Sequence, residues 1–274
     1  MQAVFYISNR TAITAETMGH SLLAQFPGTM FREITVPYID TPEKAAAAIQ
    51  QIRQVAGESS GLPLVISSLA DPEIREIFLQ CEKAIVLDLF DNFLPALSET
   101  LGIQPIHREG PSHRISNRGR YDSRIKAMNF TLLHDDGGYT RHYDQADIIL
   151  VGVSRSGKTP TCIYLALQFS IRAANYPLTE DDVRSTNLPQ ILSGHVGKLY
   201  GLTTDPERLH QFRSERRPES RYASLAQCRS EIRAAEGLFL DHGIPFLNTG
   251  TRSIEEIATS IAQERGLRTP GLAG

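Results

Sequence analysis

A glycine-containing turn at residues 152–159 separates two apolar segments and restricts the fold of this chain more than any other feature. Residues 147–151 before it have the composition of a buried strand, and residues 158–170 after it that of a helix. The turn reads Gly152-x-x-x-x-Gly157-Lys158-Thr159, an unbroken match to the P-loop pattern. A strand that enters such a turn and a helix that leaves it direct backbone N–H groups and the positive end of the helix dipole onto one anion-sized site.

The side chains of this turn suit phosphate chemistry. The two glycines allow close approach of the backbone, Lys158 can reach the outer phosphates, and the Thr159 hydroxyl can ligate Mg²⁺. The alternative is a strand-to-helix turn that ends in Lys-Thr by coincidence. The sequence predicts a nucleotide-binding loop made of Gly152, Val153, Ser154, Arg155, Ser156, Gly157, Lys158 and Thr159.

Short runs rich in β-branched and aromatic residues alternate with longer segments of helical period along the chain, which is typical of βα units around a parallel sheet. Strands are expected at residues 4–8, 31–36, 62–67, 198–203 and 244–248. Helices are expected at residues 11–25, 42–56 and 121–130, and after Pro72, Asp205, Ser224 and Ser253. The helix at 11–25 is expected to bury Ile13, Met18, Leu22 and Leu23.

Residues 102–120 lack a sustained period and are dense in Gly, Pro, Arg and His, so they are interpreted as a connection between domains. The predicted fold class is α/β, with an N-terminal parallel-sheet domain at residues 1–105. A P-loop kinase-like α/β domain that binds nucleotide and carries the chemistry is predicted at residues 106–274.

Bulk composition excludes several classes of protein. The formal net charge of −3, from 28 basic and 31 acidic residues, gives no overall drive toward nucleic acid or acidic membranes. No stretch approaches the roughly 18 apolar residues of a membrane span. Cys81, Cys162 and Cys228 are far apart and form no CxxC pair, so they are expected to be reduced thiols. We expect a cytoplasmic protein with neither a nucleic-acid nor a membrane partner.

A P-loop fixes phosphates without naming the reaction, which needs a further carboxylate for metal or base chemistry. Asp88 ends an apolar strand-like run, but it precedes the loop by far and is interpreted as an ordinary surface residue. Asp135 and Asp136, in the segment HDDGG at 134–138, are the better candidates. They could bind Mg²⁺ or accept a proton from a substrate hydroxyl, although Asp-Gly is also a common turn dipeptide.

Several long motifs together resemble one family, the bacterial phosphoenolpyruvate synthase regulatory proteins and the related plant pyruvate, phosphate dikinase regulatory protein. The similarity extends from Val4 to about Gly266. The motifs that carry it are FYISNRTAITAE (5–16), YDSRIKAMNFTLLHDDG (121–137), GVSRSGKTPT (152–161), IRAANYPL (171–178), DPERL (205–209) and RYASLAQCRSE (221–231).

The resemblance implies a bifunctional enzyme. Such proteins use ADP to phosphorylate a threonine of their target enzyme, which inactivates it, and they remove that phosphate with inorganic phosphate, releasing pyrophosphate. The ADP loop of the family falls on residues 152–159, so ADP, inorganic phosphate and Mg²⁺ are the expected ligands. Lys158, Asp135 and Asp136 are the expected catalytic residues, and one of the two aspartates would exchange the proton of the threonine.

The resemblance leaves other points open. Arg221 is favoured as a contact to phosphate or target because it begins a family-like motif. It belongs to a basic run that also contains Arg213, Arg216 and Arg217. The alternative is that the run is solvated surface, as charge runs usually are. Asn9-Arg10 stands where the family usually has an acidic and a small residue. That departure puts in doubt a role of the N-terminal domain in catalysis or metal binding. The alternative is sequence drift at a surface turn.

The expected partner is phosphoenolpyruvate synthase or pyruvate, phosphate dikinase, and the sequence does not choose between them. A homodimer is compatible with the sequence, which does not give the oligomeric state. Two other functions compete with this interpretation: a nucleotide-sensing binding protein without catalysis and a small-molecule kinase with the same loop.

Overall fold

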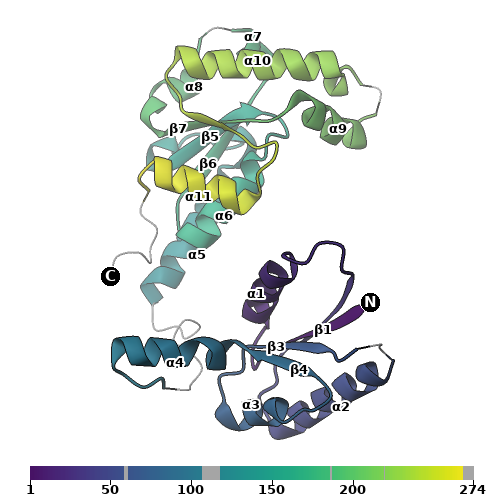
Figure 1. Cartoon of the computed structure of the whole chain (residues 1–274). Coiled ribbons are helices and arrows are strands. Elements are labelled where there is room, and N and C mark those ends of the chain that lie inside the picture. The colour runs from purple at the N-terminus through teal and green to yellow at the C-terminus, as the bar shows by residue number, and fades with distance from the viewer. Residues whose placement is uncertain (59–60, 107–117, 186, 219, 268–274) are drawn as a thin grey trace. The chain divides into compact units, whose positions relative to one another are not determined.

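The computed structural model of the protein describes residues 1–58, 61–106, 118–185, 187–218 and 220–267 (Figure 1). The chain divides into two compact units, Met1–Arg114 and Ile115–Gly274. Each unit holds a four-stranded sheet whose strands all pair in parallel. The expected α/β fold class is therefore confirmed. The boundary expected between residues 105 and 106 stays a prediction, and the connection expected at 102–120 lies largely outside the described residues.

The N-terminal unit alternates strands and helices, and its sheet has the order β2-β1-β3-β4. One core cluster packs α2 and α3 on one face of the sheet, and a smaller cluster packs α1 on the other. Proline opens both α2 and α3, as expected, and the Asp71 side chain caps α3. The elements are β1 (Gln2–Ile7), α1 (Ile13–Leu23), β2 (Phe31–Val36), α2 (Pro42–Glu58), β3 (Leu64–Ser67), α3 (Pro72–Leu79), β4 (Ile85–Asp88) and α4 (Leu89–Leu101).

The buried stripe expected for the first helix is wrong. Its buried residues are Ala15 and Gly19, whereas Ile13 is 62% exposed. The helix lies so close to the sheet that a Cβ atom on Gly19 would come within 2.3 Å of the Tyr6 ring. Small residues therefore face the sheet, and the large apolar ones point outward or lie at the margin.

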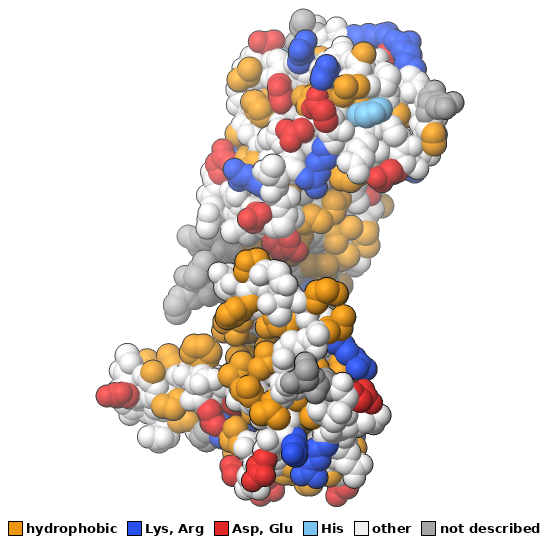
Figure 2. Space-filling view, turned by 45° about the vertical axis from the view of Figure 1, so that its right-hand side comes forward, with side chains coloured by type: hydrophobic (Ala, Val, Ile, Leu, Met, Phe, Trp, Pro, Cys, Tyr) orange, Lys and Arg blue, Asp and Glu red, His pale blue; other side chains and the backbone are white. Residues whose placement is uncertain are grey.

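Apolar side chains remain exposed on the N-terminal unit, where Figure 2 shows them gathered on the surface. In α4 no residue is buried, and Phe93 and Leu97 are each 51% exposed.

Asp88, which precedes α4 and is interpreted from the sequence as a surface residue, is instead 3% exposed. Its carboxylate caps α4 by accepting from Phe90 N and Asp91 N, and it also accepts from Ser67 Oγ.

The second unit has the sheet order β6-β5-β7-β8. Helices α6 and α11 cover one face and α10 covers the other, so β5 is buried along its whole length. The helix expected after Ser224 is present, and Ser224 caps it, because its Oγ accepts from Gln227 N at 3.3 Å. The elements are α5 (Arg118–Leu133), β5 (Ile148–Val153), α6 (Lys158–Phe169), β6 (Ala173–Leu178), α7 (Glu180–Arg184), α8 (Gln190–Ser193), β7 (Leu199–Thr203), α9 (Pro206–Arg216), α10 (Leu225–Asp241), β8 (Phe246–Asn248) and α11 (Ile254–Glu264).

Sequence periodicity missed β6. This strand contains Asn175 and Pro177, two residues that are depleted in strands. It lies at the edge of the sheet, where proline is tolerated because one side of an edge strand needs no ladder hydrogen bonds. In the register of the pairing with β5, Pro177 lies beside Gly152.

Candidate functional site

The glycine loop, residues 152–159, connects β5 to α6 at the carboxyl end of the second sheet. Two glycines give it its shape. A Cβ atom on Gly152 would lie 2.2 Å from the Leu202 carbonyl oxygen of β7, so a larger residue would force the two strands apart. Gly157 caps α6 in the left-handed conformation, with a φ of 89°, and no side chain caps that helix end. The first N–H groups of α6 therefore remain available to an anion.

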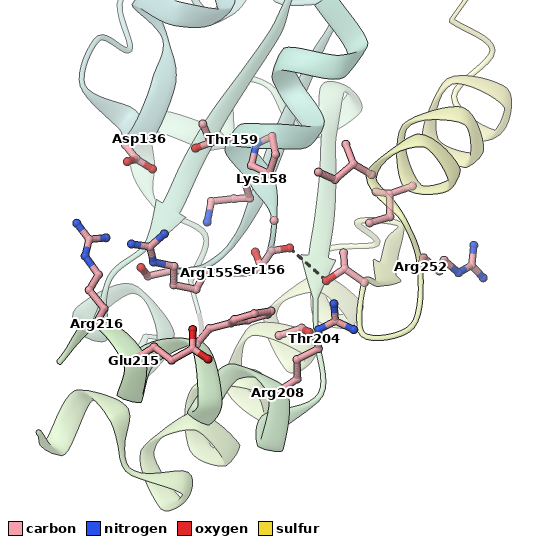
Figure 3. A pocket seen from close by; sticks show the side chains of 17 residues that line it. Asp136, Arg155, Ser156, Lys158, Thr159, Thr204, Arg208, Glu215, Arg216 and Arg252 are labelled. Atoms are coloured by element: carbon pink, nitrogen blue, oxygen red, sulfur yellow. Dashed lines mark hydrogen bonds between the residues drawn. The ribbon is translucent and has the colours of Figure 1, made fainter. Parts of the chain in front are cut away.

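A cavity of about 810 Å³ opens over this loop (Figure 3). Its walls come from the turn that holds Asp136, from one side of α9, and from the residues that follow β7 and β8. Figure 3 shows Asp136 and Arg252 on opposite sides of Lys158. The lining residues are Asp136, Ser154, Arg155, Ser156, Gly157, Lys158, Thr159, Pro160, Thr204, Arg208, Phe212, Glu215, Arg216, Thr249, Arg252, Ile254 and Ile257.

Lys158, the first residue of α6, is only 4% exposed. Its Nζ donates to the Val153 carbonyl oxygen at 2.9 Å, which folds the side chain back over the loop. Burial lowers the pKa of this lysine to about 8, and the charge of Asp136 is the first of those that oppose this effect. Lys158 forms no ion pair with the residues that the structure describes, so an anionic ligand would give this buried charge a direct partner.

Thr159, Asp135 and Asn175 form a connected group beside the loop. Thr159 Oγ1 donates to Asp135 Oδ1 at 2.8 Å, and Asn175 Nδ2 donates to the same carboxylate oxygen. Asn175 comes from β6, and its Oδ1 accepts from Asp136 N at 2.9 Å. The asparagine therefore fixes the two-aspartate turn against the glycine loop.

The two neighbouring aspartates have different surroundings. They belong to a short 3-10 turn, Asp135–Gly137, in which Asp136 has a φ of 50°. Aspartate tolerates this left-handed conformation better than most residues. The Asp135 carboxylate accepts hydrogen bonds from Thr159 and Asn175. The Asp136 carboxylate lines the cavity and forms no hydrogen bond with the residues that the structure describes. One carboxylate is thus held in place and the other is available.

Arg213 is a buried support for the loop. It is 1% exposed, and it donates to the Ser154 carbonyl oxygen at 3.2 Å, to the Tyr222 carbonyl oxygen at 3.0 Å and to Glu231 at 2.7 Å. Its guanidinium carbon lies 4.1 Å from the centroid of the Tyr222 ring, and the Tyr222 hydroxyl lies 3.0 Å from Ser154 Oγ. Contacts from segments far apart in the sequence therefore fix the glycine loop at Ser154.

Arg221 is not brought into the main cavity. It lines a separate cavity of about 420 Å³ on the other side of Ser154, where it pairs with Glu180 at 3.4 Å. Its side chain is 77% exposed, so its role as a phosphate or target contact stays a prediction. Arg216 of the same basic run lines the main cavity instead.

Sequence reasoning missed Asn175, the support by Arg213, and the wall formed by residues after β7 and β8. An asparagine inside an apolar strand-like run was the available signal for the first. The other two depend on contacts between segments that are distant in the chain. The three cysteines are free and buried.

Two features are absent from the described ranges. Within them, no three His, Cys, Asp or Glu side chains come together as a self-sufficient metal site. None of their helices combines the length and the apolar character that a membrane crossing requires. Since the described residues offer no such cluster, a metal ion at the glycine loop would need ligands from a bound phosphate as well as from the protein.

The fold and the site define an α/β protein of two units in which a strand, a glycine loop and a helix lie beside a pair of adjacent carboxylates. The chain belongs to the kinase/pyrophosphorylase family, whose model matches residues 4–262. This confirms the family resemblance of the motifs and supports a transferase activity.

Curated relatives cover nearly the whole chain. The protein is 52% identical to the "Putative phosphoenolpyruvate synthase regulatory protein" of Acinetobacter baylyi over 97% of this chain and 96% of the relative. It is 49% identical to the protein of that name from Halorhodospira halophila, over 97% of both chains. It is 50% identical to the protein of that name from Stutzerimonas stutzeri, again over 97% of both.

Proposed function

We propose that this protein transfers the β-phosphoryl group of ADP to a threonine of phosphoenolpyruvate synthase, and that it removes the phosphate again with inorganic phosphate. The observation that carries the proposal is the pairing of Thr159 with Asp135 beside a second carboxylate, Asp136, that faces the same cavity. The names of the relatives support this target over pyruvate, phosphate dikinase.

The glycine loop would hold the phosphates of either substrate. Backbone N–H groups at the start of α6 and the Lys158 ammonium supply positive charge at the same place. Ser156 adds a hydroxyl whose Oγ is buried and lacks a hydrogen-bond partner among the described residues. A polar atom in that situation gains most from a ligand that can pair with it.

The residues beside the loop fit Mg²⁺. Thr159 Oγ1 and Asp135 Oδ1 are hard oxygen donors that already lie 2.8 Å apart, and this ion usually takes one or two carboxylates together with substrate phosphates. When bound, Mg²⁺ neutralises charge on the phosphate oxygens. Asn175 keeps the Asp135 carboxylate turned toward Thr159.

Asp136 would act as the general base in phosphorylation. The threonine hydroxyl gives its proton to the Asp136 carboxylate while the threonine oxygen bonds to the β-phosphorus of ADP. The bond from that phosphorus to the bridging oxygen breaks, and AMP leaves with the electron pair. Lys158 and the loop N–H groups stabilise the charge of the transferred group.

The reverse reaction uses the same groups. An oxygen of inorganic phosphate bonds to the phosphorus of phosphothreonine, the bond to the threonine oxygen breaks, and pyrophosphate forms. The proton that the phosphate loses reaches the threonine oxygen through Asp136, so atoms and charge balance. Both directions therefore need the same carboxylate and the same anion site.

The test combines the protein with Mg²⁺, ADP and phosphoenolpyruvate synthase, and measures threonine phosphate by mass spectrometry. Asp136→Asn should lower both the phosphorylation rate and the phosphorolysis rate by about 10²–10⁴-fold, since a general base contributes that much, while ADP still binds. Asp135→Asn should instead raise the Mg²⁺ concentration needed for half-maximal rate.

Asp241→Asn, which changes an exposed aspartate at the end of α10, is the matched control and should leave both rates unchanged. Absence of threonine phosphate with the wild-type protein would contradict the proposed function. Full phosphorolysis by the Asp136→Asn protein would rule out a base shared by the two directions.

A further inference from the structure

The main cavity is much larger than a phosphate group, and its two ends differ in chemistry. At about 810 Å³ it has the size of a site for a whole small molecule. The end beside β6 carries Asp136 and Thr159. The other end lies over the carboxyl ends of β7 and β8 and carries the apolar side chains of Phe212, Ile254 and Ile257.

One side of α9 forms a wall of this second end. Arg208, Phe212 and Glu215 are spaced by four and three residues, so they lie on the same helix face and all line the cavity. Phe212 is 40% exposed and lines the cavity, so its ring is accessible to a ligand there. Arg208 lies 5.4 Å from the centroid of its ring and also donates to the Gly250 carbonyl oxygen, which fixes the helix against the residues after β8.

The start of α11 forms the opposite wall. Ile254 is the first residue of that helix and is 38% exposed, while Ile257 is buried one turn further on. The segment before this helix is tied to the glycine loop, because Thr249 Oγ1 lies within hydrogen-bond distance of the Ser156 carbonyl oxygen, at 3.3 Å, and of the Thr203 carbonyl oxygen, at 3.0 Å. The distance between the apolar end and the phosphate loop is therefore fixed by the fold.

On the Ser154 side of the loop, contacts of the Tyr222 hydroxyl with Ser154 Oγ and of Arg213 with the Ser154 carbonyl oxygen lie between the main cavity and the separate cavity that Arg221 lines. A ligand in the main cavity whose phosphates lie on the glycine loop therefore extends toward β7 and β8.

We infer that the nucleoside half of ADP binds over the ends of β7 and β8, with its base between Phe212 of α9 and Ile254 of α11. This inference rests on the proposed function and adds the site that distinguishes ADP from phosphate and pyrophosphate. Planar bases gain affinity from aromatic and apolar faces, and the Thr204 and Thr249 hydroxyls offer polar atoms at the same end.

The test compares two ligands on the full-length protein by isothermal titration calorimetry. Phe212→Ala and Ile254→Ala should each weaken ADP binding, the former by about 10-fold or more, as the loss of a stacking contact does. Affinity for pyrophosphate, which fills only the phosphate end, should change by less than about twofold. Phe26→Ala, which removes a 62% exposed phenylalanine from the N-terminal unit, is the matched control and should change neither.

The outcomes separate the two proposals. Unchanged ADP affinity in both variants, or an equal loss for ADP and pyrophosphate, would overturn this inference while leaving the proposed function intact if the wild-type protein still phosphorylates its target. An increase in the KM for the target protein with unchanged ADP affinity would assign this end of the cavity to the target instead. Ile254→Ala, at an exposed first helical position, carries the test if Phe212→Ala does not fold.

Discussion

The two units have the same sheet order, second strand, first, third and fourth, yet they offer very different sites. In each, the first strand leads into a helix whose N-cap residue is left-handed and uses no side-chain cap. That residue is Ala12, with a φ of 66°, in the N-terminal unit and Gly157, with a φ of 89°, in the second. Parallel sheets commonly bind ligands at this point, where the strand order reverses.

The residues after the first strand of each unit account for the difference. The second unit has glycines that bring the backbone close, a buried lysine, and a carboxylate that no described side chain occupies. In the N-terminal unit the turn contains Asn9 and Arg10, and the Asp88 carboxylate already accepts three hydrogen bonds. The shared topology provides a place for a ligand, and the loop residues and an available carboxylate provide the chemistry.

Of the comparisons between the two units, the largest effect should come from the first residue of the helix that follows the first strand, which is Lys158 in the second unit. Lys158→Met removes the buried positive charge of the glycine loop and should lower target phosphorylation by about 10²–10³-fold. The same change should raise the free energy of unfolding by about 1–3 kcal/mol, because a buried charge without an ion pair is removed.

The matched variant in the N-terminal unit is Ile13→Met, at a 62% exposed position, which should change neither quantity. Steady-state rates and urea unfolding check both variants. A Lys158→Met protein that is less stable than the wild type would show that the lysine supports the fold rather than costing stability for the sake of phosphate binding.

Asp88→Asn tests the opposite case, a carboxylate used for structure. Its side chain accepts from Ser67 Oγ at 2.9 Å and from two backbone N–H groups at the start of α4, and an amide would present its own N–H groups to some of these donors. We expect a loss of about 1–3 kcal/mol of unfolding free energy, with the rate per folded molecule unchanged. A large loss of rate in a fully folded Asp88→Asn protein would give the N-terminal unit a catalytic role.

The sequence predicted most elements of both sheets because the apolar residues of each element, as in β5 and α6, are the ones that the fold buries. It failed where packing distance decided the outcome. The period of apolar residues in α1 suggested a stripe of large side chains, but Gly19 and Ala15 face Tyr6 and the sheet. Strand β6 escaped notice because proline at a sheet edge has no local signature that separates it from a loop.

The sequence likewise predicted only part of the candidate site. The glycine loop is a local motif, so eight consecutive residues predict it. Asn175 joins Asp135 and Thr159 across 40 and 16 residues of chain, and no spacing rule connects them. Asp135 and Asp136 have equal claims to the catalytic role on sequence grounds. Their hydrogen bonds differ in the structure, and this difference supports the proposal that Asp136 is the base.

The pH dependence of ADP binding should reveal the buried lysine. The pKa of Lys158 is lowered to about 8, so the free protein loses this charge above that pH, and ADP affinity should fall by about tenfold between pH 7 and pH 9. Because the folded pKa lies below the ordinary value, the lysine costs stability at neutral pH, and that cost disappears as the pH rises from about 8 to about 10.5.

Calorimetric titration at several pH values checks this, with Lys158→Met as the reference that should show no such fall. An affinity for the wild-type protein that stays constant up to pH 9 would mean that the lysine keeps its proton and that burial has little effect on its pKa.

The smallest effects should show whether the two units unfold separately. Gly57, in α2, and Gly237, in α10, are helical glycines at which an added Cβ would meet no atom within 4 Å. Replacing either with alanine should therefore stabilise its own unit by about 0.5–1 kcal/mol, since alanine loses less backbone freedom on folding. If the units unfold independently, Gly57→Ala raises one transition in differential scanning calorimetry and Gly237→Ala raises the other. A single transition that both variants raise would show that the two sheets, alike in topology, also share one cooperative unfolding step.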